Sequence, residues 1–137
     1  MQHTKTFLVA SWLLRLIVAA ILLQTLFFKF SAAKESVYIF STLGVEPWGR
    51  IGSGIFELIA SILLLVPSTV VLGALMALAA TGSAIIFHLT KLGIALPAVG
   101  DRGELFVLAV VVVGCSIGLL YLHRQDLVMA ASRLRTT

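Results

Sequence analysis

The side chains best suited to chemistry are ionisable residues that stand alone in long apolar stretches. Glu57 lies in GIFELIASILLLVP, His88 in AIIFHLT and Lys29 in FFKF. Carboxyl and imidazole groups exchange protons within reach of neutral pH. An ionisable side chain at the centre of a membrane helix costs about 2.5–3.5 kcal/mol, so it is usually paired or functional. These three residues are therefore candidates for a polar pocket.

The composition indicates what surrounds them. Of the 137 residues, 60% are hydrophobic and 12% are charged, whereas soluble domains contain about 45–50% apolar and about 25% charged residues. A chain this short cannot bury so much apolar surface in a water-soluble core, and its length suits one domain over residues 1–137. Its Lys and Arg residues form no basic run interleaved with aromatic residues. The pattern therefore argues against nucleic-acid binding and favours contact with membrane lipid.

Four stretches are long and apolar enough to cross a bilayer as helices. They cover residues 7–30, 48–66, 70–89 and 105–122. We expect an all-α integral membrane protein with a left-handed bundle of four transmembrane helices. Four crossings put both termini on one side. Lys and Arg are almost equally numerous on the two sides, and we expect the termini to be cytoplasmic.

The first loop, KESVYIFSTLGVEPWGR, is too polar to span a membrane but carries several apolar and aromatic residues. We expect it to form a short helix in the membrane interface, with Trp48 at the level of the headgroups. The alternative is a functional lid over a cavity.

Small and polar residues recur at helical spacing in the later stretches, and in lipid such faces turn inward. The second stretch carries Arg50, Gly54, Glu57 and Ser61; the third carries Gly73, Ala77, Thr81, Ala84, His88 and Lys91; the fourth carries Glu104, Val111 and Gly118. Gly114 and Gly118 also form a G-x-x-x-G pair, which either packs within the bundle or serves a homodimer.

Position along the helices brings the candidates to one depth. Glu57 follows Arg50 by seven residues, about 10 Å along a helix axis. Lys29, His88 and Glu104 fall at the same end of their own helices. We therefore expect these four candidates to gather in the half of the bundle near the two loops on that side.

Several of these residues also have structural interpretations. Lys29 could extend to the headgroups, and His88 could be a hydrogen-bonded core histidine. Glu104 could form a capping box with Asp101. Arg15, about 12 Å inside the first stretch, could extend to the opposite headgroups or reach Glu57. The sequence leaves open whether Arg15, Lys29 or a ligand holds Glu57.

Taken in order, these features resemble the DoxX family of small four-helix bacterial membrane proteins. The resemblance rests on Arg15, FFKF, GIFELIASILLLVP, AIIFHLT and GDRGELFVL, and it covers roughly residues 15–121. QTLFF stands where a glycine-rich approach to the lysine is expected, which indicates a divergent member. The resemblance implies location in the cytoplasmic membrane and quinone or redox partners.

Three functions are compatible with these observations. The first is a redox- or quinone-associated accessory component, with a quinone head among Glu57, His88, Lys29 and Glu104. The single cysteine provides no thiol pair, and His3 and His123 belong to the opposite end, so electrons would come from a protein partner. The second is a non-catalytic assembly factor resembling a chaperone, and the third is a small-molecule or proton-coupled transporter. We expect no metal site, and whether the chain is an enzyme is left open.

Overall fold

The computed structural model describes residues 4–136. Within that range the regular secondary structure is helical, apart from one isolated bridge between Leu96 and Asp101. Four helices are long and apolar enough to cross a membrane by length and composition. They are α1 (Lys5–Phe30), α3 (Trp48–Leu65), α4 (Val70–Phe87), which continues into the π-helical turn η2 (His88–Leu92), and α5 (Glu104–Leu122). The four expected helices are thus confirmed.

Local signals set the ends of these helices. The Thr4 hydroxyl accepts a hydrogen bond from the Phe7 N–H and caps α1. Pro67 lacks an N–H and cannot continue α3. The short 3₁₀ helix η1 (Pro67–Thr69) then turns the chain into α4. This connection makes α3 and α4 a tight antiparallel hairpin.

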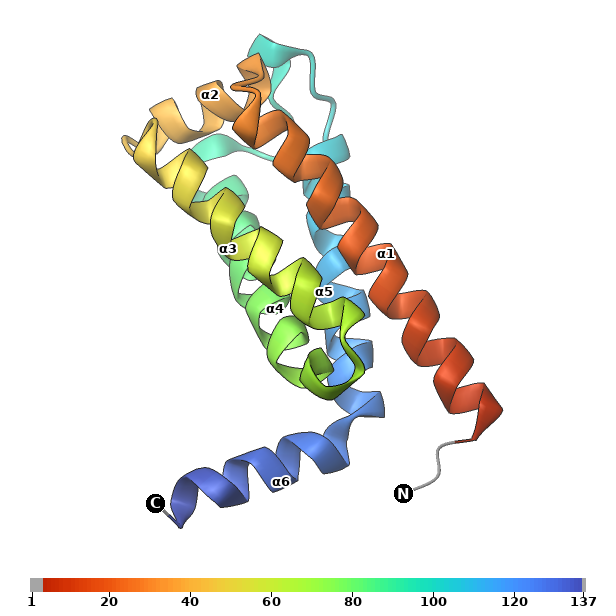
Figure 1. Ribbon diagram of the computed structural model, residues 1–137. Coiled ribbons are helices and arrows are strands. Elements are labelled where there is room, and N and C mark those ends of the chain that lie inside the picture. Colours follow the sequence, from red (N-terminus) through yellow and green to blue (C-terminus); the bar gives the residue numbers. More distant parts are fainter. Residues whose placement is uncertain (1–3, 137) are drawn as a thin grey trace.

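The four long helices form a ring in which each has two neighbours. α1 and α4 each pack against both α3 and α5 (Figure 1). Their shared core consists of aliphatic residues: Val18, Leu22, Ala60, Leu64, Val70, Ala74, Ala77, Val112 and Leu119. Gly73 permits the closest approach, because a Cβ there would lie 2.8 Å from the backbone nitrogen of Leu64. The small residue therefore brings α3 and α4 together.

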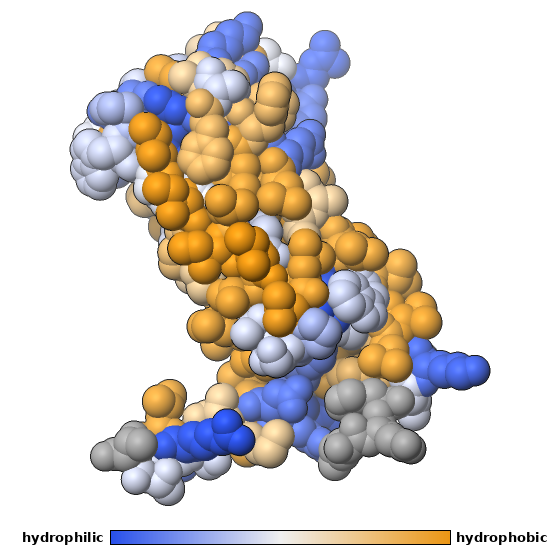
Figure 2. Space-filling model, viewed as in Figure 1, coloured by the Kyte–Doolittle hydropathy of each residue, from blue (hydrophilic) through white to orange (hydrophobic). Residues whose placement is uncertain are grey.

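The outside of the bundle is also apolar. Figure 2 shows hydrophobic side chains over the middle of the molecule and hydrophilic ones at its two ends. Large apolar side chains such as Phe27, Ile62 and Ile117 are exposed for half or more of their surface. Soluble monomers rarely expose apolar patches of this extent. This surface and the four long helices suggest a multi-pass membrane protein.

Two short helices lie at opposite ends of the bundle. α2 (Lys34–Thr42) is the short helix expected in the first loop, and it contacts α1, α3, η2 and the 3₁₀ helix η3 (Pro97–Val99). α6 (Arg124–Arg135) was not expected. Figure 1 shows α6 and the start of α1 together, at the end away from α2. α2 therefore closes one end of the bundle.

The inward face expected for α5 is wrong. Glu104 and Val111 are exposed, and the buried residues of α5 are Ala109, Val112, Ser116 and Leu119. α5 is apolar all round, so the few small residues do not define its face, and packing against α4 and α1 does. Gly118 faces Leu14 of α1, whereas Gly114 has open space beside it. A homodimer through Gly114 and Gly118 stays a prediction.

Candidate functional site

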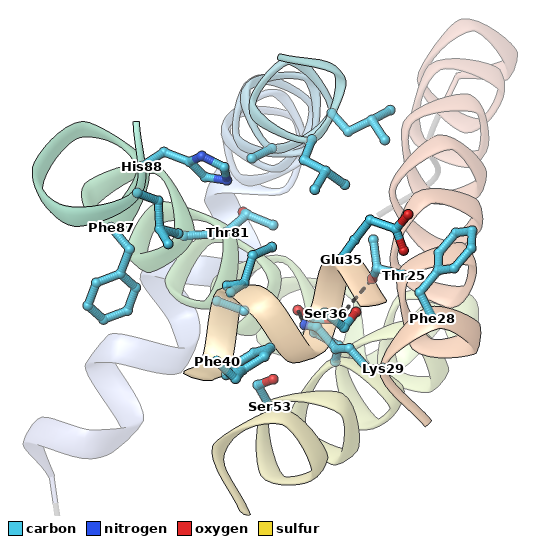
Figure 3. Close-up of a pocket in the computed structure, with 18 of the residues that line it drawn as sticks. Thr25, Phe28, Lys29, Glu35, Ser36, Phe40, Ser53, Thr81, Phe87 and His88 are labelled. Atoms are coloured by element: carbon cyan, nitrogen blue, oxygen red, sulfur yellow. Dashed lines mark hydrogen bonds and ion pairs between the residues drawn. The ribbon is translucent and has the colours of Figure 1, made fainter. Parts of the chain in front are cut away.

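A cavity of about 550 Å³ lies beneath α2, in the half of the bundle away from the termini. Figure 3 shows His88 and Thr81 on one wall and Thr25 and Lys29 on the other. Its walls are mainly aliphatic and aromatic, and its lining includes Phe28, Phe40, Phe56 and Phe87. The lining comes from α1, α2, α3, α4, η2, the loop before α5, and α5 itself. Four of the five candidate residues line it: Glu57, Lys29, His88 and Glu104.

The partner of Glu57 is Lys29. The Lys29 ammonium lies 2.5 Å from Oε1 of Glu57, and the Thr25 hydroxyl lies 3.0 Å from Oε2. Both charged side chains are largely buried, with 13% and 9% of their surfaces exposed. Lys29 therefore does not simply extend to the headgroups. It lies in the last turn of α1, where the helix dipole favours a cation.

The neighbouring Arg50 fixes the end of α1. Its Nη1 donates to the backbone oxygen of Lys29, and its Nε lies 2.9 Å from a carboxylate oxygen of Glu46. The polar stripe of α3 is confirmed, because Arg50, Gly54, Glu57 and Ser61 are all buried. One face of α3 thus holds both the backbone and the side chain of Lys29.

His88 is buried where α4 widens into η2. Its Nδ1 lies 2.8 Å from the carbonyl oxygen of Gly93, so Nδ1 carries the hydrogen, because a carbonyl only accepts. Gly93 has φ +87 and ends the turn, a conformation that glycine adopts without strain. In the neutral ring Nε2 is then an acceptor, and it has no hydrogen-bond partner within residues 4–136. His88 is hydrogen-bonded in the core and still offers one nitrogen.

Two acids organise the start of α5, though not as the expected capping box. Asp101 Oδ1 accepts from the N–H groups of Gly103 and Leu105, and Glu104 accepts from the Arg102 N–H at 2.6 Å. Each acid thus accepts from an N–H one residue further along the chain than in a capping box of Asp101 and Glu104, because Gly103 takes φ +117 and α5 begins at Glu104. Both acids nevertheless lie where a helix N-terminus favours negative charge.

The Asp101 carboxyl has an unusual environment. Burial alone would raise its pKa. A hydrogen bond with the Glu104 side chain and hydrogen bonds from several backbone N–H groups lower the pKa by more than burial raises it, so it lies below its ordinary value. Oδ2 of Asp101 is buried and has no donor among the described residues when both carboxyls are ionised. The bond between the two carboxyls exists only when Glu104 carries a proton.

Arg15 does not belong to this site. Its Nε donates to the backbone oxygen of Leu64 at 2.5 Å, and its guanidinium stacks 3.6 Å from the centre of the Trp12 ring. The side chain is buried, so neither expected role, extension to headgroups or pairing with Glu57, is correct. The last carbonyls of α3 have no N–H donor within the helix, and Arg15 supplies a donor to one of these carbonyls, that of Leu64.

Sequence reasoning also missed a buried polar contact at the other end. Oγ of Ser11 lies 2.8 Å from Nε2 of His123, and Nδ1 of that ring lies 3.2 Å from Asp126. Ser11 is 1% exposed, so this chain of bonds joins α1 to the α5–α6 junction and is closed to a substrate. His3 lies outside the described residues.

Within residues 4–136, no group of three or more His, Cys, Asp or Glu side chains is arranged to hold a metal ion. Comparison with protein-family models, curated proteins and solved structures finds no match for this chain. The site must therefore be interpreted from its own geometry. It combines a closed ion pair, the buried acceptor Oδ2 of Asp101, the accessible acceptor Nε2 of His88 and apolar walls.

Proposed function

We propose that this chain is a multi-pass protein of the cytoplasmic membrane. In this proposal α1, α3, α4 and α5 form a left-handed transmembrane bundle, α2 lies in the membrane interface and both termini are cytoplasmic. The four long apolar helices and the apolar outer surface support insertion. Trp48, the first residue of α3, is 70% exposed and supports the interfacial position of that end.

Within the bundle, we propose that the cavity binds a small amphipathic molecule. One observation carries this proposal: polar side chains from separate helices meet on the wall of a single, otherwise apolar cavity of about 550 Å³. Ligand sites have this character, with apolar walls and a few polar groups that orient the ligand. The ion pair at Glu57 would fix one end of the molecule, and the apolar lining would surround its body.

The DoxX-like motifs suggest that the molecule serves a redox system, with a quinone as its class. This role as a redox- or quinone-associated accessory component remains a prediction from the resemblance. A role as an assembly factor is the alternative, and the buried polar contacts would then only specify the packing of the bundle.

Extraction of the purified protein tests the binding proposal. The protein in mild detergent is extracted with organic solvent, and the extract is analysed by mass spectrometry. We expect a small amphipathic molecule in stoichiometric amount, reduced at least severalfold in Glu57→Gln. Asp126→Asn, which changes a carboxylate at the other end of the bundle, should retain it. Lipid alone in the extract, together with a stoichiometric protein partner in pull-downs, would favour the assembly factor.

A further inference from the structure

The cavity wall carries more negative than positive charge. Its lining contains four carboxylates, Glu35, Glu57, Asp101 and Glu104, and one ammonium, Lys29. Glu57 and Lys29 neutralise each other at 2.5 Å. Other cations at this end of the molecule are not part of the lining: Lys34, Arg50, Lys91 and Arg102. The side chains of Glu35, Asp101 and Glu104 are therefore left without a cation on the wall, whether or not Asp101 and Glu104 share a proton between them.

Two acceptor atoms show that this charge is more than helix capping. Asp101 is 7% exposed and His88 is 5% exposed, and both line the cavity. Oδ2 of Asp101 is a buried acceptor without a donor from any described backbone or ionised side chain. Nε2 of His88 is an accessible acceptor that likewise has no donor within residues 4–136. A buried acceptor without a donor costs about 1–3 kcal/mol. Both atoms thus favour a partner that donates hydrogen bonds.

The aromatic walls fit the same partner. Phe28, Phe40, Phe56 and Phe87 line the cavity, and aromatic faces attract ammonium groups. Phe40 already lies beside a cation, because its ring centre is 5.7 Å from the Lys29 ammonium. Figure 3 shows the rings of Phe28 and Phe87 pointing away from the middle of the cavity, so Phe40 is the ring beside which a second ammonium would meet both carboxylates and an aromatic face.

We propose that the occupant of the cavity is a protonated organic amine with an apolar body. The proposal rests on the proposed binding of a small amphipathic molecule in the same cavity, and it replaces the quinone that the resemblance suggests as that molecule. The ammonium donates to Oδ2 of Asp101, a further donor on the ligand serves Nε2 of His88, and the body lies against Phe40 and the aliphatic lining. A quinone presents carbonyl oxygens, which only accept, and would leave both Oδ2 of Asp101 and Nε2 of His88 without a donor.

Equilibrium dialysis tests this proposal with an amine and an alcohol that share the same apolar body, and with a quinone. The full chain in phosphatidylcholine nanodiscs is dialysed against 4-phenylbutylamine, 4-phenyl-1-butanol or decylubiquinone, with empty nanodiscs as the blank. We expect saturable binding of the amine, and binding of the alcohol weaker by about 10- to 100-fold, the range for losing a charged hydrogen bond. Equal binding of amine and alcohol would overturn the proposal.

Variants locate the amine. Asp101→Asn keeps an oxygen for the α5 N–H groups and removes the charge, so it should weaken amine binding about 10-fold or more while circular dichroism stays unchanged. Glu35→Gln, on α2, should weaken it less, and Asp126→Asn not at all. Unchanged affinity in both Asp101→Asn and Glu35→Gln would place the amine elsewhere and contradict the proposal.

The three probes also separate the two levels of inference. Binding of decylubiquinone without binding of the amine would leave the proposed function standing and overturn the amine. No saturable binding of any probe, together with no small molecule in the solvent extract, would overturn both.

Discussion

Replacing Glu57 by glutamine should destabilise the bundle by an amount that its surroundings determine. The substitution keeps the size of the side chain and its contact with the Thr25 hydroxyl, but it removes the carboxylate 2.5 Å from the Lys29 ammonium. Breaking a buried ion pair by removing one partner costs about 3–5 kcal/mol. Lys29 lies in the last turn of α1 and is 13% exposed, so part of its charge regains water. We therefore expect Glu57→Gln to lower the free energy of unfolding by about 2–3 kcal/mol.

The complementary change should cost more. Lys29→Met leaves the Glu57 carboxylate, 9% exposed and deeper in the bundle, with only a hydroxyl as its donor, and we expect about 3–4 kcal/mol. The double variant has no charge to bury. Its loss should therefore be smaller than the sum of the two single losses by about 2 kcal/mol or more.

Equilibrium unfolding in mixed micelles with a rising fraction of sodium dodecyl sulfate measures these losses, with helical circular dichroism as the signal. Lys91→Met is the matched control, because Lys91 is exposed at the same end and is in none of the ion pairs of residues 4–136. It should change stability by less than about 0.5 kcal/mol. Single losses that simply add in the double variant would refute the buried pair.

Three further predictions use matched substitutions. Gly73→Ala should destabilise the protein by about 1–3 kcal/mol, because its Cβ would meet backbone at 2.8 Å, whereas Gly82→Ala has open space and should be neutral or stabilising; unfolding of both measures this. Ser11→Ala should cost about 1–3 kcal/mol by leaving a buried ring nitrogen unpaired, and Ser116→Ala should cost less, because that hydroxyl has no partner in the described structure; equal losses would contradict this. The pKa of Asp101 is lowered in the folded protein, so its ionised carboxylate stabilises the fold above the unfolded pKa of about 3.9, and this stabilisation is lost as pH falls. The difference in unfolding free energy between the wild type and Asp101→Asn should therefore be smaller at pH 3 than at pH 7.

The helices could be predicted because a membrane-spanning helix is defined by its own residues. The expected ranges 7–30, 48–66 and 105–122 end within two residues of α1, α3 and α5. The inward face of α3 was also predictable, because Arg50, Gly54, Glu57 and Ser61 are its few polar or small residues on one stripe. Where a helix is strongly two-sided, spacing alone gives its orientation.

The rest depended on contacts between distant residues. α5 is apolar on every side, so its buried face follows from its neighbours and not from its own sequence. Arg15 binds a backbone carbonyl of α3. Every residue has such a carbonyl, so the sequence does not indicate which one Arg15 binds. Ser11 and His123 are 112 positions apart. The depth of Lys29 and Glu57 in the bundle was predictable. That Glu57 pairs with Lys29 and not with Arg15 could be known only from the packing of α1 against α3.

Filling the cavity tests the central claim most directly. Ala84 lines the cavity and Ala79, on the same helix, is exposed outside it. The measurement is the amount of small molecule extracted per mole of protein from nanodiscs, for the wild type, Ala84→Phe and Ala79→Phe. A cavity that holds a ligand predicts loss in Ala84→Phe and retention in Ala79→Phe, with both variants folded. Equal amounts in all three proteins would contradict a ligand in this cavity.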